Sequence, residues 1–245
     1  DQVLDHYSRE EVISYGKQVA WNQLWRNFCV SDTFEPGSPS KILTVAAGLE
    51  EGILKGNEYF DCGGYLHVGD WDIKCTAYRR GGHGSLSLTE SIMQSCNVAM
   101  MRIGAMMGRD IFTKYQTIFG MGQKTGVDLP GEADAAGLVY SADKMGPTEL
   151  ATNAFGQNYN CTMIQMAAAL CSVINGGSYY EPHVVRQILN EQGSVVERKD
   201  PVLVRETVSQ STSDFLKEAM FQTVENGTGG AAKVAGYQVG GKTGT

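Results

Sequence analysis

Apolar residues recur every three to four positions over several stretches of the chain, which is the pattern of amphipathic helices. Two stretches begin with a capping box, in which a serine is followed three residues later by a glutamate: Ser8 with Glu11, and Ser87 with Glu90. The stretch over 162–174 is apolar nearly all round, so we expect its helix to be buried. The expected helices cover residues 8–25, 42–54, 88–107, 111–119, 162–174 and 212–225.

Strand patterns are found in the last third of the chain. Residues 179–189 and 194–198, separated by the turn residues 190–193, predict a hairpin. Residues 233–241 predict a strand that runs into the last residues. No internal repeat, low-complexity tract or proline-rich linker divides the sequence, so we expect residues 1–245 to form a single unit dominated by helices.

Composition and charge exclude several kinds of protein. The chain is 42% hydrophobic and 19% charged, which is ordinary for a globular domain and excludes disorder, collagen and coiled coil. Twenty Lys and Arg against 27 Asp and Glu give a net charge of −7, the wrong sign for a nucleic-acid partner. The longest nearly apolar stretch, 163–174, is too short for a membrane span. The first residues lack the features of a targeting segment, so we expect any such segment to lie outside this chain.

Cysteine and histidine spacing gives no support for a metal site. The six cysteines contain no C-x-x-C pair and are interpreted as scattered free thiols. Cys62 and Cys75 flank a turn-rich stretch, and a disulfide between them is the less favoured alternative. The four histidines lie far apart, and His83, within a Gly-Gly-His-Gly run, is interpreted as a turn residue. No metal and no cofactor are therefore expected.

Three short patterns together point to serine acyl transfer: Ser-x-x-Lys, Ser-x-Asn and Lys-Thr-Gly. Ser-x-x-Lys occurs three times, beginning at residues 14, 38 and 141. Lys-Thr-Gly occurs twice, at 124–126 and 242–244, and Ser-x-Asn occurs once, at 95–97. Counting motifs cannot choose among these, so their context must.

Ser38 has the most favourable context of the three serines. Pro39 suits the first position of a helix, which places Ser38 at a helix N-terminus. Lys41 then lies one turn on and on the same face, where its amine is expected to reach the Ser38 hydroxyl. The pairs at 14/17 and 141/144 are interpreted as solvated surface pairs.

A serine hydroxyl becomes a good nucleophile only when a base takes its proton. Lys41 can act as that base when its amine is neutral. Burial beside a second cation lowers the pKa of a lysine, and Lys242 is the candidate for this cation.

The remaining motif residues suit the other steps of acyl transfer. Ser95 is expected to relay a proton to the leaving amine, and Asn97 to hold the amide of the substrate. Lys242 and Thr243 are expected to bind its carboxylate, while Gly244 lets the substrate backbone approach closely. Taken alone, Ser95 fits a serine that bonds its own backbone equally well, and Lys242 fits a solvated lysine better.

The sequence resembles the monofunctional (class B) penicillin-binding proteins, the D,D-transpeptidases of cell-wall synthesis, from about residue 25 onwards. The run Asp-Thr-Phe-Glu-Pro-Gly-Ser over 32–38 looks like the approach to the active serine of that family. The resemblance also assigns the Lys-Thr-Gly at 124–126 to a stretch of the family away from the catalytic strand. The stretches that carry the resemblance are 25–38, 95–97, 125–132, 155–165, 175–177 and 241–245.

This resemblance implies a fold, a reaction and a location. The fold would be the α/β, multi-domain α and β type of β-lactamases and penicillin-binding transpeptidases. The domain would bind peptidoglycan stem peptides ending in D-Ala-D-Ala, acylate Ser38 and pass the acyl group to the amine of another strand. β-Lactams would acylate the same serine, and the amides of Ser38 and Thr245 would form the oxyanion hole. The family is anchored at the extracytoplasmic face of the membrane by a helix outside this chain.

Two departures from the family pattern affect this expectation. Pro39 and Ser40 replace the threonine and aromatic residue usual between the serine and lysine, which leaves the spacing intact and alters the pocket floor. The central sheet of the family takes strands from before residue 1 and after residue 245. We therefore expect a domain truncated at both ends, with mostly helices and an incomplete sheet, so that activity of this chain is in doubt.

Two other functions share these residues. A β-lactamase or β-lactam sensor is favoured only by Glu149 and Asn153, which have the spacing of the deacylating pair in class A β-lactamases but not the intervening residues. A non-catalytic scaffold domain of a cell-wall synthesis complex, with other wall-synthesis proteins as partners, is opposed by the complete motif set.

Overall fold

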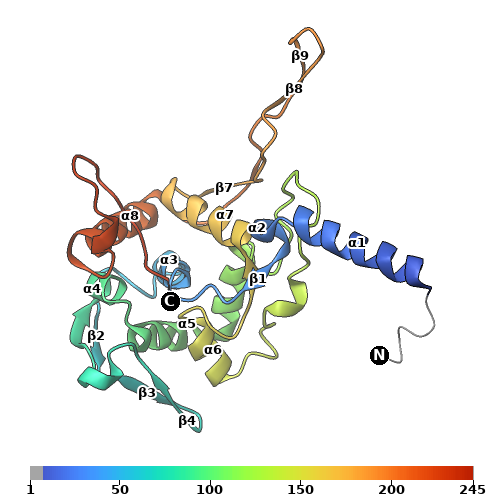
Figure 1. The fold of residues 1–245 in the computed structure, drawn as a ribbon. Coiled ribbons are helices and arrows are strands. Elements are labelled where there is room, and N and C mark those ends of the chain that lie inside the picture. The colour runs from blue at the N-terminus through green and yellow to red at the C-terminus, as the bar shows by residue number, and fades with distance from the viewer. Residues whose placement is uncertain (1–7, 245) are drawn as a thin grey trace.

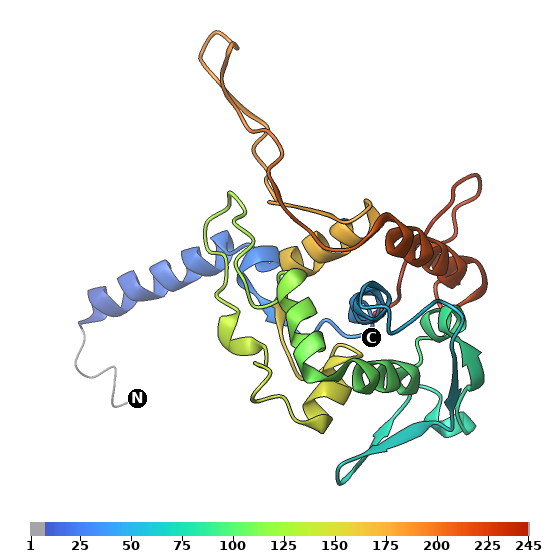
Figure 2. The ribbon, with the colours of Figure 1, turned by 180° about the vertical axis from the view of Figure 1, so that it is seen from behind.

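The computed structural model of the chain describes residues 8–244. One buried helix, α3 (Ser40–Glu50), lies at its centre and packs against α5 (Asn97–Ile118), α7 (Met163–Ile174) and α8 (Gln210–Asn226), as Figures 1 and 2 show. Every residue of α3 from Ser40 to Gly48 is buried, because neighbouring helices cover it on several sides. A single apolar cluster built around this helix forms the core.

The region expected to be one helix over 88–107 is two helices. α4 (Leu88–Met93) ends before Ser95, whose φ of 54° lies in the left-handed region, and α5 begins at Asn97. α5 then bends at Gly108, with a φ of 73°, and continues through the separately expected 111–119 stretch. The expectation of one helix over 88–107 was wrong because the apolar spacing continues across the break at Ser95, whereas the expected boundary between 107 and 111 coincides with the kink at Gly108.

Three capping boxes start helices in the part of the chain that the structure describes. The expected boxes at Ser8 and Ser87 are present, and Thr162 with Gln165 forms a third at the start of α7. The expectation that the helix over 162–174 is buried holds for one face only, because α7 also exposes Met163, Cys171 and Ile174. The remaining helices are α1 (Arg9–Trp25), α2 (Phe28–Ser31) and α6 (Pro147–Asn153), with 3-10 turns at Tyr78–Arg80, Ala136–Leu138 and Gly230–Ala232.

All strands of the described residues form antiparallel pairs, each a separate two-stranded sheet. Within residues 8–244 no larger sheet joins them, in agreement with the expected mostly helical fold. The pairs are β1 (Thr33–Phe34) with β6 (Cys161–Thr162), β2 (Tyr59–Cys62) with β5 (Gly84–Ser87), β3 (Tyr65–Val68) with β4 (Trp71–Lys74), β7 (Ser178–Tyr180) with β10 (Leu203–Glu206), and β8 (Gln187–Leu189) with β9 (Val195–Arg198).

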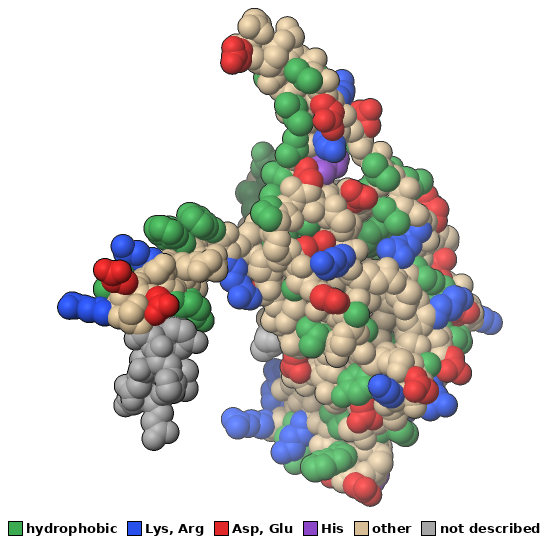
Figure 3. Space-filling model, turned by 90° about the vertical axis from the view of Figure 1, so that its right-hand side faces the viewer, with side chains coloured by type: hydrophobic (Ala, Val, Ile, Leu, Met, Phe, Trp, Pro, Cys, Tyr) green, Lys and Arg blue, Asp and Glu red, His purple; other side chains and the backbone are tan. Residues whose placement is uncertain are grey.

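The predicted hairpin is confirmed as β8 and β9, although its first arm is shorter than expected because β7 pairs with β10. This hairpin and α1 stand away from the body of the molecule, as Figure 3 shows. The expectation of a strand over 233–241 was wrong. No strand within the described residues pairs with this segment, which is irregular and is tied to α8 by a bond from the Gly241 amide to the Met220 carbonyl. Among the described helices, none combines the length and apolar character that a membrane span requires.

Candidate active site

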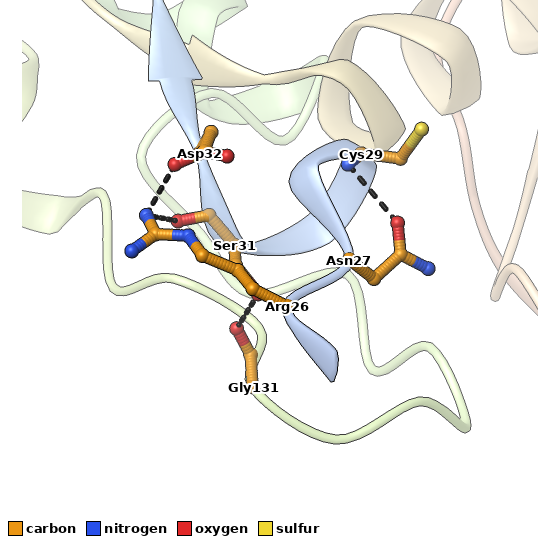
Figure 4. A network of polar contacts seen from close by, with 6 residues as sticks. All are labelled: Arg26, Asn27, Cys29, Ser31, Asp32 and Gly131. Atoms are coloured by element: carbon orange, nitrogen blue, oxygen red, sulfur yellow. Dashed lines mark hydrogen bonds and ion pairs between the residues drawn. The ribbon is translucent and has the colours of Figure 1, made fainter. Parts of the chain in front are cut away.

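Polar contacts fix the segment that leads to Ser38, as Figure 4 shows. Asn27 caps α2, and Arg26 pairs with Asp32 and also donates to the Ser31 carbonyl at 3.1 Å. The Ser31 hydroxyl donates to the carbonyl of Gly131 at 2.7 Å. These bonds join the approach to Ser38 to the 125–132 stretch, which the sequence had singled out only as part of a resemblance.

Ser38 lies in a tight turn directly before α3 and is 7% exposed. The Gly37 amide donates to the Gly156 carbonyl at 2.8 Å, and a Cβ on Gly156 would lie 1.9 Å from the Gly37 carbonyl oxygen. Glycine is therefore required at 156 for the two backbones to approach. The prediction that Ser38 lies at a helix N-terminus is confirmed, with Pro39 at the N-cap position and Ser40 as the first helical residue.

Lys41 is completely buried, and its amine makes three hydrogen bonds. It donates to the Ser95 carbonyl at 2.7 Å, to Ser95 Oγ at 3.0 Å and to Asn97 Oδ1 at 2.6 Å. Within the described residues none of its hydrogen bonds runs directly to Ser38. Burial, and after it the charge of Lys242, lowers the pKa of Lys41 to about 7. About half of the Lys41 amines are therefore neutral near pH 7 and able to accept a proton.

The Ser95 hydroxyl connects the two lysines to Ser38. It donates to Ser38 Oγ at 3.0 Å and accepts from Lys41 at 3.0 Å and from Lys242 at 2.9 Å. One donated and two accepted bonds use the full capacity of a hydroxyl group. Ser38 and Lys41 thus communicate through Ser95, and the left-handed backbone at Ser95 aims the hydroxyl between them.

The last described residues bring a second amine to this network. Lys242 is partly buried, which lowers its pKa to about 8, and it also donates to the Thr243 carbonyl at 3.1 Å. The Thr243 hydroxyl lies 2.9 Å from that of Thr228, and Gly244 lies beside Pro39. Lys242 is therefore not a solvated lysine, and Thr245 lies outside the described residues.

Asn97 and Ser40 complete the surroundings. Asn97 is the first residue of α5, and its Nδ2 donates to the Lys74 carbonyl at 3.2 Å. Ser40, which departs from the family pattern, shares a buried hydrogen bond of 2.7 Å with the Tyr159 hydroxyl. The contact with Tyr159 is one that sequence reasoning missed, because 119 positions separate the two residues.

The other candidate motifs lie apart from this network. The pairs at 14/17 and 141/144 are exposed, as expected for surface pairs. In the Lys-Thr-Gly at 124–126, the Thr125 hydroxyl donates to the Glu132 carboxylate at 2.6 Å. Asn153 is buried and bonds to Gln116, and among the described residues neither it nor Glu149 hydrogen-bonds to Ser38.

Comparison with known proteins gives a consistent result. A family model for the penicillin binding protein transpeptidase domain matches residues 2–245. Stage V sporulation protein D of Bacillus subtilis is 39% identical over 223 residues, which are 90% of this chain and 34% of that protein. Penicillin-binding protein PbpB of Mycolicibacterium smegmatis is 33% identical over 229 residues, 89% of this chain and 34% of that protein. The chain thus spans about a third of the length of these relatives.

Solved structures agree in fold. The D,D-transpeptidase domain of a peptidoglycan glycosyltransferase from Eggerthella lenta superposes with a TM-score of 0.82 at 24% identity, over 94% of this chain and 59% of that one. Penicillin binding protein 3 from Mycobacterium tuberculosis, complexed with aztreonam, gives 0.78 at 29% identity, over 89% of this chain and 49% of that one. The expected penicillin-binding transpeptidase-like α/β fold is confirmed.

Proposed function

The chain belongs to the penicillin binding protein transpeptidase domain family, and from that premise we propose that it is a serine D,D-transpeptidase acting through an acyl-enzyme on Ser38. The observation that carries the proposal is the chain of hydrogen bonds from Ser38 through Ser95 to Lys41 and Lys242. Relatives named peptidoglycan D,D-transpeptidases, in Acinetobacter baumannii and Buchnera aphidicola, support the same reaction. We take residues 1–245 as one transpeptidase domain.

In the first half-reaction, Ser38 Oγ attacks the carbonyl carbon of the penultimate D-Ala of a stem peptide. The Ser38 proton passes through the Ser95 hydroxyl to the neutral Lys41 amine, since these atoms are 3.0 Å apart at each step. The bond to the terminal D-Ala then breaks, and its nitrogen takes the proton back by way of Ser95. Lys242 and Thr243 bind the carboxylate of the departing D-Ala.

In the second half-reaction, the amine of another stem peptide attacks the Ser38 ester. This attack forms the amide cross-link and breaks the ester bond to Ser38, whose oxygen takes up the proton lost by the attacking amine. A β-lactam is attacked in the same way. Its ring amide bond breaks, but the nitrogen stays attached to the rest of the molecule and does not leave the site, so the ester on Ser38 persists. Proposed ligands of the site are therefore stem peptides and β-lactams. From the likeness to peptidoglycan D,D-transpeptidases we also propose other wall-synthesis proteins as partners and a location at the extracytoplasmic face of the membrane.

The alternative functions receive less support. In a β-lactamase, Glu149 and Asn153 would together have to activate a water molecule next to the Ser38 ester. Asn153 is instead hydrogen-bonded to Gln116, away from the serine network. A non-catalytic scaffold would not need two lysines with lowered pKa values converging on one hydroxyl. Perturbed pKa values of this kind concentrate at catalytic sites.

The test uses a peptide ending in D-Ala-D-Ala together with an amine acceptor such as a D-amino acid. We expect release of D-Ala coupled to incorporation of the acceptor, loss of both with Ser38→Ala, and retention of both with the surface variant Ser141→Ala. A matched peptide ending in D-Ala-L-Ala should not react. Hydrolysis without transfer, together with rapid release of a bound β-lactam, would instead assign the protein to the β-lactamases.

A further inference from the structure

A cluster of three cysteines and one histidine lies directly beside the Ser95 turn. The sulfurs of Cys62, Cys75 and Cys96 and a ring nitrogen of His83 all lie within 4.8 Å of one another. The three cysteines are 2%, 4% and 0% exposed, and His83 is partly exposed. All three cysteines are free thiols and form no disulfide. The reaction proposed above uses none of these four side chains.

The distances match those of a tetrahedral zinc site. Zinc binds cysteine sulfur at about 2.3 Å and histidine nitrogen at about 2.0–2.1 Å, so the tetrahedron has S···S edges of about 3.8 Å and S···N edges of about 3.6 Å. Cys75 Sγ lies 3.9 Å from Cys96 Sγ and 3.6 Å from His83 Nδ1. Closing the widest pair, at up to 4.8 Å, requires a movement of about 1 Å. By contrast, a disulfide would require the sulfurs to approach to about 2.05 Å.

The backbone around the cluster is built to hold these side chains in place. Cys62 ends β2, and its partner in the register is Gly84, so the neighbouring His83 is brought beside Cys62. A Cβ on Gly82, whose φ is 104°, would lie 2.0 Å from the Cys62 carbonyl oxygen, so only glycine allows the loop to turn His83 inward. The sequence Gly-Gly-His-Gly, interpreted above as a simple turn, is thus the loop that delivers a fourth ligand.

Backbone amides hydrogen-bond to two of the sulfurs. The amide of Asn97 donates to Cys75 Sγ at 3.3 Å, and the amide of Ala99 donates to Cys96 Sγ at 3.4 Å. Hydrogen bonds of this kind orient the sulfurs around a structural metal.

We propose that Cys62, Cys75, His83 and Cys96 bind one zinc ion in a closed, tetrahedral Cys3His site. Binding replaces the remaining thiol protons, which pass to solvent, and leaves the zinc without an open position. The zinc therefore has a structural role. The three buried sulfurs form the inner part of the site, and partly exposed His83 is the ligand at its entrance.

The position of this site gives it a consequence for acylation. Cys96 is the central residue of the Ser95–Asn97 turn, and Cys75 follows Lys74, whose carbonyl accepts a hydrogen bond from Asn97. A metal ion bound to both cysteines would fix the strained Ser95 backbone, and with it the hydroxyl that links Ser38 to Lys41. Displacing a catalytic group by about 1 Å can cost on the order of 100-fold in rate. This consequence rests on the proposed function, whereas zinc binding itself does not.

The test begins with the metal content of the protein purified under reducing conditions without chelator, measured by mass spectrometry of the elements. We expect about one zinc per chain, lost in Cys75→Ser, bound more weakly in His83→Gln and retained in the matched control Cys171→Ser, whose side chain is exposed and outside the cluster. Replacement of zinc by cobalt should give the intense absorption of a tetrahedral cobalt–thiolate centre. Circular dichroism of each variant reports whether it folds.

The cobalt spectrum and metal content of the unaltered protein test the proposal even if Cys75→Ser does not fold. No stoichiometric zinc, no cobalt–thiolate absorption, or a disulfide mapped between two of the three cysteines would overturn it. Chelation of the zinc should slow acylation of Ser38 by a β-lactam by on the order of 10- to 100-fold, with restoration on adding zinc back. A protein that binds zinc but never acylates Ser38 would retain this site and refute only the proposed function.

Discussion

Removing the charge of Lys242 should move the pH dependence of acylation, because this charge helps to keep Lys41 neutral. Both amine nitrogens lie within 3.0 Å of Ser95 Oγ, so they are at most about 6 Å apart, and at an effective dielectric constant of about 20 the repulsion is roughly 3 kcal/mol. Burial is the larger cause of the decrease of the Lys41 pKa from 10.5 to about 7, which keeps the share of Lys242 to about one to two pH units.

The variant Lys242→Gln therefore raises the pKa of Lys41 towards its ordinary value. A base must be neutral to accept a proton, so acylation increases with pH through this pKa, and the rising limb should move from near pH 7 to about pH 8–9. At pH 7 the neutral fraction falls from about one half to about 1–10%, which slows acylation about 5- to 50-fold from this cause alone.

The assay is the second-order rate constant for acylation by a fluorescent penicillin, measured from pH 6 to pH 10. Lys242→Arg is the matched control, because it keeps the charge and should leave the rising limb near pH 7. In the unaltered protein the rate should decline again above about pH 8, because Lys242 then loses the proton with which it binds the carboxylate of the penicillin. A rising limb that stays near pH 7 in Lys242→Gln would refute the coupling of the two lysines.

Four further substitutions test the geometry. Ser95→Ala should leave the fold intact and slow acylation by about 100- to 10,000-fold, because it removes the hydroxyl that connects the nucleophile to the base; stopped-flow labelling measures this, and a rate within about threefold of normal would contradict the proton path. Gly156→Ala places a Cβ 1.9 Å from the Gly37 carbonyl oxygen and should lower both the free energy of unfolding, by more than about 2 kcal/mol, and the acylation rate; urea unfolding with unchanged stability would argue against the tight turn. Thr162→Ala should lower the free energy of unfolding by about 1 kcal/mol, while Ser8→Ala, which caps a helix with no buried residue, should change it by less than about 0.5 kcal/mol; equal effects in denaturant titration would contradict this difference.

Local signals predicted the parts of the site that local structure determines. Pro39 after Ser38, followed by an apolar helix, placed the nucleophile and Lys41 correctly at the start of α3. Capping boxes likewise fixed the beginnings of α1 and α4. In each case the residues that decide the structure lie within a few positions of one another.

Features that depend on tertiary contacts were missed. The apolar pattern over 88–107 gave no sign of the break at Ser95, because the left-handed backbone there is stabilised by long-range bonds from Lys41 and Lys242. Residues 233–241 have the composition of a strand but find no strand partner within residues 8–244. Spacing along the chain also hid the cluster around Cys75, since tertiary contacts bring its members together, among them the β2–β5 pairing that places Cys62 beside His83.

The most direct measurement of the central claim is the intact mass of the protein after incubation with benzylpenicillin, followed by peptide mapping of the adduct. The account predicts one stable penicilloyl group per chain, located on Ser38 and absent in Ser38→Ala. An unmodified mass from protein shown to be folded, or an adduct on another residue, would contradict it.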